Sequence, residues 1–417
     1  MNLLFVHQNF PGQFGRLSAH LAAAGHRVVA IGERDQLERR EPVAGVTRVV
    51  YPRPRGAGAR THPYLQRLEG DVRRAQAVVR AAIRLREQGF SPEVIYGNPG
   101  WGELLFIRDV FPQAALIALY EFYFHPGEGD HGFDPATPAT LDSTLRLRVR
   151  NATLALTIER ADFLVSPTRW QASRVPRPHR NRLSVIHDGL DTARCRPDRE
   201  ARFIHTALPA ALTCADEVLT YVSRNLEPYR GFDVFMRALP AILAARPRAR
   251  VVIVGGDAVS YGSAPASGGN WREVLVSEVG AHLDPERVHF TGRIPYADLV
   301  ALFQVSTVHV YLTYPFVLSW SMLEAMACGA LVVGSSTAPV TEMIEHGVTG
   351  LLTDFHRPER IAQDVIDALA RAHDLAAVRA AARAQVVERF DFERVCAPAQ
   401  TALIERAYTA GARRRAA

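Results

Sequence analysis

Short apolar runs alternate along the chain with longer segments of helical periodicity. In the first half they predict strands at 3–6, 27–31, 94–96 and 115–119, helices near 13–24 and 63–88, and a helix beginning at Gly102. In the second half they predict strands at 219–222, 251–254, 288–290, 308–312 and 330–333, with helices at 231–245, after Asn270 and at 322–328. This order predicts an α/β fold with two doubly wound parallel sheets.

The length supports the same division, because 417 residues exceed one ordinary core. We expect a Rossmann-like domain at 1–190 and a second one at 191–390, with a C-terminal helix at 391–417 that joins the first. We expect the two domains to face each other across a cleft. A Gly- and Ser-rich insertion at 260–270 is expected to be mobile without ligand.

The stretch 308–336 predicts a strand, a loop, a short helix and a second strand. Its loop at 314–321 would lie at the carboxyl end of a parallel strand and lead into a helix N-terminus, where anions are favoured. Glu324 lies one turn into this helix. Two interpretations are open, a ligand contact or a capping box, because Ser321 and Glu324 fit S-x-x-E.

Three loops of the first half also follow predicted strands. They are 7–12 (HQNFPG), 97–103 (GNPGWGE) and 121–125 (EFYFH). The carboxyl ends of parallel strands share one edge of a sheet, so these loops would converge on one site. The alternative is that their glycines and prolines form plain turns.

The chain contains no lysine, so arginine supplies all 49 basic residues. Schiff-base chemistry, pyridoxal phosphate anchoring and a Walker A loop are therefore excluded. Residues 1–190 hold 25 arginines against 18 acidic residues, whereas 191–417 hold 24 against 25. This excess predicts an anionic partner of the first domain, either an acidic acceptor or a membrane surface. The helix near 64–86 is then either a membrane-binding basic helix or a surface helix packed on its own sheet.

The four cysteines are scattered, without a C-x-x-C pair or the spacing of metal ligands. We expect no disulfide, no metal site and no bound cofactor. No basic leader followed by an apolar stretch begins the sequence, and no run of about 18 apolar residues follows. A cytoplasmic protein is expected, with peripheral contact to the inner face of a membrane as an option and with no nucleic-acid partner. The oligomeric state is not indicated.

Six segments together carry a family resemblance. They are VIHDGLD (185–191), SRNLEPYRGFD (223–233), VIVGGD (252–257), VHFTGRIPYADLVALF (288–303), LEAMACGALVV (323–333) and TEMIEHGVTGLL (341–352). In order and spacing the chain resembles the retaining family 4 glycosyltransferases of the GT-B fold, the bacterial glycosyl transferases group 1. The resemblance is dense over 219–355 and looser in the first half. It implies a nucleotide-sugar donor on the second domain and a variable acceptor on the first.

The resemblance also implies roles for single residues. Arg224 and Arg230 would hold the donor diphosphate, Glu324 the ribose hydroxyls, and His125 would lie beside the reacting sugar. Because the family has lysine where this chain has Arg230, the resemblance implies that Arg230→Lys keeps most activity. The other implied donor contacts are Gly12, Gly256, Arg293, Ile294, Phe316, Val317, Leu318, Ser319, Trp320 and Ser321. The acceptor contacts would be Asn98, Trp101 and Glu121.

One position departs from the family pattern. The family's E-x7-E motif places a glutamate eight residues before Glu324, and this chain has Phe316 there. The missing carboxylate usually orients the hydroxyls of the donor sugar. We expect the backbone amides of 317–320 and the Ser319 hydroxyl to remain available for the donor.

The resulting prediction is a metal-independent retaining glycosyltransferase, since no Asp-x-Asp motif is present. Its donor would be a UDP-sugar, with a GDP-sugar as the alternative, and its acceptor a saccharide, a lipid-linked or another small molecule. A role in cell-surface polysaccharide or glycoconjugate synthesis would follow. Two other functions are open: a catalytically silent nucleotide-sugar-binding protein, which Phe316 suggests, and a sugar-nucleotide epimerase. A phosphorylase is excluded because it needs a lysine.

Overall fold

The chain divides into two compact units. The computed structural model describes residues 1–127 and 129–416, with side chains as far as residue 412. Unit 1 comprises Met1–Gly189 and Phe392–Ala417, and unit 2 comprises Leu190–Asp391. The boundaries predicted from the sequence, 190 and 391, lie next to these. Unit 2 is therefore inserted in the sequence of unit 1.

Unit 1 contains one parallel sheet of seven strands in the order β3-β2-β1-β4-β5-β6-β7. The strands are β1 Asn2–Val6, β2 Arg27–Glu33, β3 Val46–Tyr51, β4 Val94–Gly97, β5 Ala115–Leu119, β6 Phe163–Ser166 and β7 Leu183–Val185. The four predicted strands are confirmed. Strand β3 was not predicted, because it is a half-exposed edge strand whose apolar run is interrupted by Arg48.

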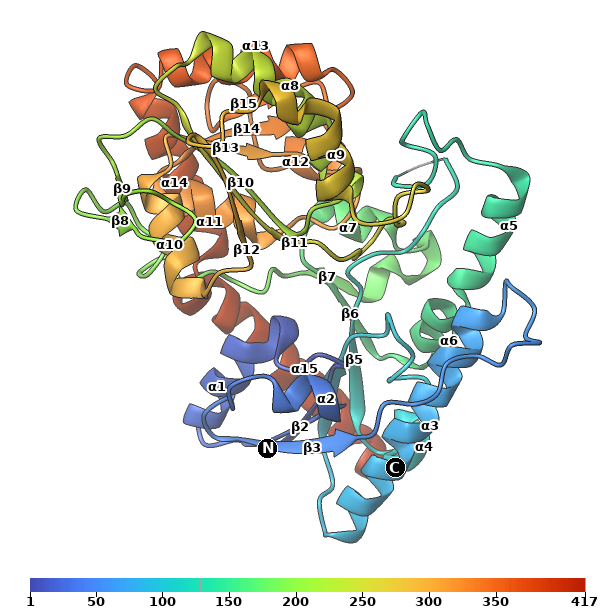
Figure 1. Cartoon of the computed structure of the whole chain (residues 1–417). Helices are drawn as coiled ribbons and strands as arrows, with labels where there is room; N and C mark the ends of the chain where they lie inside the picture. The colour runs from blue at the N-terminus through green and yellow to red at the C-terminus, as the bar shows by residue number, and fades with distance from the viewer. Residues whose placement is uncertain (128, 417) are drawn as a thin grey trace. The chain divides into compact units, whose positions relative to one another are not determined.

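The helices of unit 1 cover both faces of this sheet. They are α1 Gly15–Ala23, α2 Arg34–Glu38, α3 Gln66–Glu87, α4 Ile107–Val110, α5 Leu141–Arg150, α6 Ala152–Arg160, α7 Arg169–Arg174 and α15 Ala397–Ala416. Shorter turns lie at Gly12–Phe14, Arg177–Arg182 and Phe392–Cys396. Helix α15, red in Figure 1, contacts α1 and strands β4 and β5, whereas α3 contacts β2, β3 and α6. Among the described residues, no helix is both long and apolar enough to cross a bilayer.

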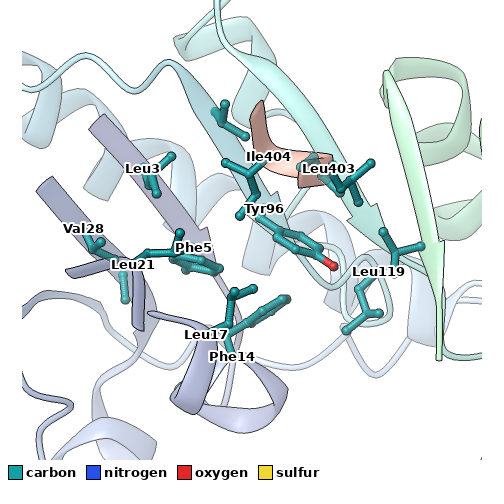
Figure 2. Packing of buried hydrophobic residues seen from close by; sticks show 14 of the residues in the cluster. Leu3, Phe5, Phe14, Leu17, Leu21, Val28, Tyr96, Leu119, Leu403 and Ile404 are labelled. Atoms are coloured by element: carbon teal, nitrogen blue, oxygen red, sulfur yellow. The ribbon is translucent and has the colours of Figure 1, made fainter. Parts of the chain in front are cut away.

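The core of unit 1 depends on side chains from both ends of the chain. Leu3 and Phe5 point to the same face of β1 and pack with Phe14 of the following turn (Figure 2). Leu403 and Ile404 of α15 complete this cluster and are at most 1% exposed. Full burial of one such side chain contributes roughly 1.5–3 kcal/mol. The C-terminal helix is therefore an integral part of unit 1.

The expected helix from Gly102 is wrong in extent. The chain forms turns there, and helix α4 covers only Ile107–Val110. Gly102 has a φ of +94°, and a Cβ at this position would lie 2.5 Å from the carbonyl oxygen of Asp71. The backbone thus adopts a left-handed conformation where α3 approaches closely, which interrupts a helix and favours glycine.

Unit 2 contains a second parallel sheet, of six strands in the order β12-β11-β10-β13-β14-β15. Its strands are β10 Val218–Asn225, β11 Arg250–Gly256, β12 Val288–Gly292, β13 Val308–Tyr311, β14 Leu331–Ser335 and β15 Leu351–Thr353. A small antiparallel pair, β8 Arg202–Phe203 and β9 Leu212–Thr213, precedes the sheet. All five predicted strands of this half are confirmed.

Two groups of helices enclose the sheet of unit 2. The helices are α8 Phe232–Ala245, α9 Trp271–Val279, α10 Tyr296–Val305, α11 Trp320–Cys328, α12 Ala338–Thr341, α13 Pro358–Ala370 and α14 Ala376–Phe390. Helix α8 packs with α9 and α13, and α11 packs with α10 and α14 (Figure 1). Every residue of α11 after Trp320 is buried, so its apolar sequence is that of a core helix.

Each sheet has one position where the strand order reverses. In unit 1 the chain adds β2 and β3 on one side of β1 and then continues with β4 on the other side. In unit 2 it adds β11 and β12 on one side of β10 and continues with β13 on the other. Open α/β sheets bind ligands outside the carboxyl ends of the strands at such switch points. The loops after β1, β4, β10 and β13 are therefore the candidate sites.

Candidate functional site

Arg230 lies at the switch point of unit 2, at the end of the turn Pro228–Arg230 that follows β10. It is 7% exposed. Its Nη1 donates to Thr313 Oγ1 at 2.7 Å, to the carbonyl oxygen of Val317 at 3.0 Å and to the Tyr311 hydroxyl at 3.3 Å. The guanidinium thus joins the loops that follow the two central strands.

Among the described residues, no aspartate or glutamate forms an ion pair with Arg230. Burial acts to lower the pKa of Arg230, but the oxygens of Tyr311, Tyr261 and Tyr229 outweigh it and raise the pKa. The guanidinium therefore stays charged. A buried cation balanced only by hydroxyl and carbonyl dipoles is a ready site for an anion.

Arg224 differs from Arg230 in its surroundings. It is the penultimate residue of β10 and its side chain is exposed. The structure assigns it no hydrogen bond or ion pair with a described residue. A substitution of Arg224 would therefore leave the packing of unit 2 intact.

A second group of predicted donor contacts lies at the ends of β11 and β12. Arg293 Nη2 donates to Asn225 Oδ1 at 2.8 Å, and a Cβ on Gly256 would lie 2.8 Å from Arg293 Nε. Ile294 packs against the core cluster that contains Val252 and Val254. The structure thus brings Gly256 and Arg293 together through Asn225, a residue that the sequence analysis did not identify.

Helix α11 begins two residues earlier than the capping-box interpretation requires. Ser319 is its N-cap, and its Oγ accepts from the amide of Ser321 at 3.4 Å. The interpretation of Ser321 and Glu324 as a capping box is therefore wrong. The expectation that the Ser319 groups are available to the donor is also wrong in part. The Ser319 amide donates to the Tyr311 hydroxyl at 2.8 Å, and the Ser319 hydroxyl already serves as the cap.

The remaining residues of this loop differ in exposure. Phe316 and Leu318 are each 7% exposed, Val317 is half-buried, and Trp320 is 36% exposed. Ser321 is buried in the first turn of α11. Trp320 thus has the largest exposed fraction of the predicted donor-contact residues in this loop.

Glu324 is 5% exposed, and its Oε1 accepts from the Tyr296 hydroxyl at 2.9 Å. Burial raises the pKa of Tyr296, and the Glu324 carboxylate raises it further. Tyr296 therefore keeps its proton and donates it to the carboxylate. This contact fixes the orientation of Glu324 independently of the helix cap.

Glu324→Gln is expected to weaken donor binding about tenfold without lowering the melting temperature appreciably. The amide oxygen of glutamine still accepts from Tyr296, but it binds a ribose hydroxyl less strongly than a carboxylate does. Calorimetric titration with UDP and thermal melting provide the two readouts. Glu345→Gln, an exposed position of the same unit, is the matched control. A large loss of stability with unchanged UDP affinity would show that Glu324 serves the fold.

The insertion after β11 is attached to the rest of unit 2 by Glu227. This carboxylate is fully buried and accepts from the amides of Ser260 at 3.2 Å, Tyr261 at 3.2 Å and Gly262 at 2.9 Å. The first residues of the insertion thus have a defined attachment. The expected mobility of 260–270 stays a prediction.

The switch point of unit 1 brings together two of the predicted acceptor contacts. Asn98 Nδ2 donates to Glu121 Oε2 at 2.6 Å, and Gln13 Nε2 donates to Glu121 Oε1. These three side chains come from the loops after β4, β5 and β1. The third predicted contact, Trp101, packs edge-on against His7, with ring centroids 5.2 Å apart. The convergence of the three strand-end loops is confirmed.

Gly12 and His125 lie at different positions near the carboxyl ends of the strands of unit 1. Gly12 begins the turn after β1, and a Cβ there would lie 2.6 Å from the His7 ring. His125 is half-buried, and its Nε2 is 2.6 Å from the carbonyl oxygen of Arg174, to which it donates. This bond leaves Nδ1 as the ring nitrogen for a sugar contact. The predicted role of His125 stays a prediction.

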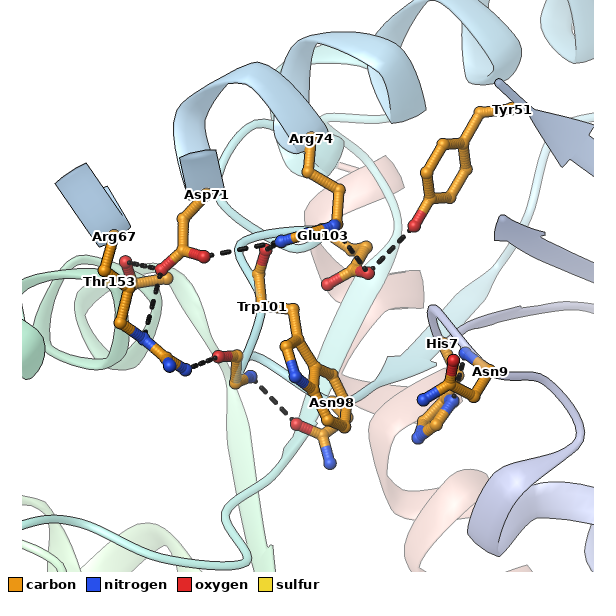
Figure 3. A network of polar contacts seen from close by, with 11 residues as sticks. His7, Asn9, Tyr51, Arg67, Asp71, Arg74, Asn98, Trp101, Glu103 and Thr153 are labelled. Carbon is orange, nitrogen blue, oxygen red and sulfur yellow. Dashed lines mark hydrogen bonds and ion pairs between the residues drawn. The ribbon is translucent and has the colours of Figure 1, made fainter. Parts of the chain in front are cut away.

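A polar network holds the backbone of the loop at 97–103 (Figure 3). Arg74 of α3 donates to the carbonyl of Trp101 at 2.7 Å and pairs with Asp71 at 3.4 Å. Arg67 donates to the carbonyl of Gly100 at 2.9 Å, and the amide of Gly100 donates to Asn98 Oδ1 at 2.8 Å. Two arginines of α3 thus position the loop that carries Asn98 and Trp101.

Glu103 is the most deeply buried carboxylate of this network in unit 1. It is fully buried, accepts from the Tyr51 hydroxyl at 2.9 Å and lies 3.9 Å from Arg74 Nε. Burial raises the pKa of Glu103 to about 7, against the opposing effect of the Arg74 charge. Burial also raises the pKa of Asp71 and of Glu33 nearby.

The raised pKa predicts that unit 1 loses stability as the pH rises. Below about 4.5 Glu103 is protonated in both states, and between there and about 7 the unfolded chain releases the proton first. The loss attributable to Glu103 is about 3 kcal/mol of unfolding free energy. Chemical unfolding at pH 5 and pH 8 should show this loss in the wild type and less of it in Glu103→Gln.

The exposed Glu87→Gln at the end of α3 is the control and should behave as the wild type. Asp71 and Glu33 leave a residual pH dependence in every variant. An unchanged pH dependence in Glu103→Gln would contradict the assignment.

Several residues near the carboxyl ends of the two sheets were not identified from the sequence. They are His7, Gln13, Asn225, Glu227, Tyr261, Tyr296 and Thr313. For His7, Asn225, Glu227 and Thr313 a signal existed, since each is a polar residue in the segment between a predicted strand and the helix predicted after it. Gln13 and Tyr296 gave no such signal, because Gln13 falls at the start of a predicted helix and the partner of Tyr296 lies 28 residues away in the sequence.

The two parallel-sheet units, with the residues at the carboxyl ends of their strands, define a protein of the GT-B class. A family model described as "Glycosyl transferase family 4 group" matches residues 24–195, and one described as "Glycosyl transferases group 1" matches 212–385. The chain belongs to the family 4 glycosyltransferases, as its sequence motifs predicted.

Curated relatives and solved structures agree with this assignment. D-inositol 3-phosphate glycosyltransferase of Rhodococcus jostii is 29% identical over 57% of this chain and 51% of its own length. That of Acidothermus cellulolyticus is 30% identical over 44% and 39%. The matches thus span about half or less of these relatives.

Two solved structures share the fold over nearly the whole chain. Sucrose-phosphate synthase from Thermosynechococcus elongatus superposes with a TM-score of 0.70 at 19% identity, covering 98% of this chain and 100% of that one. The HepE protein of Anabaena, solved in complex with UDP, superposes with a TM-score of 0.67 at 17% identity, covering 97% and 100%.

Proposed function

We propose that the protein transfers a sugar from a nucleotide-diphosphate sugar to an acceptor hydroxyl, with the donor on unit 2 and the acceptor on unit 1. The observation that carries this proposal is Arg230, a buried cation at the switch point of unit 2 with no acidic partner among the described residues. A diphosphate would balance its charge. The family membership and the names of the relatives support the same reaction.

In the proposed reaction the acceptor oxygen attacks the anomeric carbon on the face from which the diphosphate departs. The bond between that carbon and the phosphate oxygen breaks, its electron pair leaves with the nucleoside diphosphate, and the acceptor proton passes to the departing phosphate. The configuration is therefore retained. Arg224, Arg230 and the amino end of α11 would stabilise the charge that grows on the phosphate, without a metal ion.

The donor and acceptor are proposed by class. The UDP and UDP-glucose complexes of the structural neighbour HepE support a UDP-sugar, with a GDP-sugar as the alternative. The arginine excess of residues 1–190 and the phosphorylated acceptor in the relatives' names support an anionic or lipid-linked acceptor. Asn98, Trp101, Glu121 and His125 would contact it. Such a reaction suits polysaccharide or glycoconjugate synthesis on the cytoplasmic side of a membrane.

Mass spectrometry after incubation with a panel of UDP-, GDP- and ADP-sugars tests the reaction. Slow hydrolysis of one donor without acceptor, and faster release of the nucleoside diphosphate when a saccharide or polyprenyl phosphate is added, are expected. Donor binding without turnover under every acceptor would support the catalytically silent alternative. No binding of any nucleotide sugar would refute the proposal.

Helix α3 would provide a peripheral membrane contact. The structure packs one face of α3 on its own sheet through Val78, Ala82 and Leu85, as the surface-helix interpretation predicts. Arg80 and Arg84 remain exposed beside a groove of about 560 Å³ that Val79, Ile83, Phe106 and Val110 help to line.

Flotation with vesicles that contain phosphatidylglycerol is expected to show binding that high salt removes and that Arg80→Glu with Arg84→Glu abolishes. Vesicles of phosphatidylcholine alone are the lipid control. Arg248→Glu, an exposed position of unit 2, is the protein control. Equal binding to neutral and acidic vesicles would contradict the proposal.

A further inference from the structure

Two aromatic rings lie beside the guanidinium of Arg230, and two further rings pack with them. Tyr229, Tyr261, Tyr314 and Phe316 form this aromatic cluster, with ring centroids 4.8 Å apart for Tyr229 and Tyr314 and 5.2 Å apart for Tyr261 and Phe316. The guanidinium carbon lies 5.2 Å from the Tyr261 centroid and 6.0 Å from that of Phe316. Charge and aromatic surface thus share one site at the switch point of unit 2.

The position of Tyr261 in the cluster is set by buried polar groups. The Glu227 carboxylate binds three successive amides around Tyr261, and Asn225 Nδ2 donates to Ser260 Oγ at 2.6 Å. These contacts hold the loop after β11 against the end of β10 and the loop that follows it. Tyr261 remains 37% exposed, whereas Tyr314 and Phe316 are at most 8% exposed. Tyr229 is half-buried, so Tyr261 is the most exposed ring of the cluster.

The cluster changes what a donor sugar would meet at position 316. A carboxylate accepts hydrogen bonds from sugar hydroxyls, whereas the ring of Phe316 offers an apolar surface. A hydroxyl placed against this ring would lose its hydrogen bonds to water without gaining one in exchange. A C–H bond or a methyl group would bury apolar surface there instead.

We propose that the aromatic cluster beside Arg230 selects a donor whose sugar is deoxygenated on the side that faces the cluster, so that the substrate is a nucleotide-linked deoxyhexose. This inference rests on the proposed function and specifies its donor. Apolar sites discriminate weakly against one added hydroxyl, by at most about 100-fold. We therefore expect a preference of about 10- to 100-fold for the deoxygenated member of a matched donor pair.

Matched pairs that differ by one hydroxyl test the preference directly. UDP-glucose is compared with UDP-3-deoxyglucose, UDP-4-deoxyglucose and UDP-6-deoxyglucose, and GDP-mannose with the corresponding GDP-deoxymannoses. Calorimetry gives the affinity, and nucleoside diphosphate release gives the turnover. One deoxygenated donor should exceed its parent at least tenfold in turnover at limiting donor concentration. If the parent donor equals or exceeds every deoxygenated partner, the inference is overturned while the transferase function stands. If no nucleotide sugar binds, both fail.

Substitutions of Phe316 and Tyr261 test whether the aromatic cluster causes the donor preference. Phe316→Gln, which introduces a hydrogen-bonding side chain, should reduce or reverse the preference, whereas Phe316→Leu should largely keep it. Tyr261→Ala removes the exposed ring and should weaken binding of the deoxygenated donor about tenfold while UDP or GDP alone binds as before. Because Tyr261 is partly exposed, this variant stays informative even if the changes at Phe316 destabilise unit 2. An unchanged donor preference in both Phe316→Gln and Tyr261→Ala would overturn the inference.

Discussion

Arg224→Ala is expected to lower turnover by about two orders of magnitude while the melting temperature stays the same. The side chain is exposed at the carboxyl end of β10 and forms no hydrogen bond or ion pair with a described residue. A charge-assisted bond that strengthens as the diphosphate leaves is worth roughly 2–4 kcal/mol in the transition state, which corresponds to this loss in rate.

Donor turnover at saturating nucleotide sugar, with a melting curve for each protein, is the measurement. Arg248→Ala is the matched control, because Arg248 is also exposed but lies just before β11, at the amino end of the same sheet. Arg224→Lys should fall between the wild type and Arg224→Ala, since a point charge replaces a planar fork. Near-normal turnover of Arg224→Ala would show that Arg224 is a surface charge.

Arg230→Ala is expected to lower turnover at least as strongly and also to lower the melting temperature. This arginine donates to Thr313, to the Val317 carbonyl and to Tyr311, and its guanidinium carbon lies 5.2 Å from the centroid of the Tyr261 ring. Its removal leaves buried acceptors without their donor, at a cost of roughly 1–3 kcal/mol. Turnover must therefore be compared well below the melting temperature, per folded molecule.

The contacts of Arg230 also change an expectation drawn from the family. Lysine is the usual family residue there, which implied that Arg230→Lys keeps most activity. A lysine ammonium lacks the delocalised guanidinium, whose carbon lies 5.2 Å from the Tyr261 centroid and 6.0 Å from that of Phe316. Its single nitrogen would also have to replace Nη1 in the bonds to Thr313, Val317 and Tyr311 and bind the diphosphate at the same time. We now expect a loss of about tenfold or more. Thr313→Val, which removes one acceptor but no charge, should lower stability with little effect on turnover. If Arg230→Ala retains turnover, the diphosphate role fails.

Much of the fold was predictable because buried parallel strands are continuous apolar runs. The run that begins at Leu3 is such a case, since the sheet buries both faces of β1 and needs no alternation. Edge strand β3 was not predicted because it is half-exposed, and its polar residues Thr47 and Arg48 interrupt the apolar run. The false helix at Gly102 arose because propensity does not reveal that α3 approaches the backbone there.

The candidate site was predictable where it depends on loop position and not where it depends on distant partners. Arg230 and Asn98 each follow a strand, so topology alone brings them to the correct edges. The hydrogen bond from Tyr296 to Glu324 and the attachment of Tyr261 by Glu227 join segments that only the fold brings together. For the same reason the S-x-x-E pattern was misleading, since it does not reveal which serine begins the helix.

The insertion of unit 2 within the sequence of unit 1 determines the order in which the chain can fold during synthesis. Residues 190–391 form unit 2 without help from later residues, so this unit can fold as soon as that stretch has left the ribosome. Unit 1 is translated first but is completed last, because Leu403 and Ile404 arrive about 200 residues after the last strand of its sheet. Until then Phe5, Phe14 and Leu17 lack the helix that covers them. We therefore expect nascent unit 1 to keep this apolar face uncovered throughout the synthesis of unit 2.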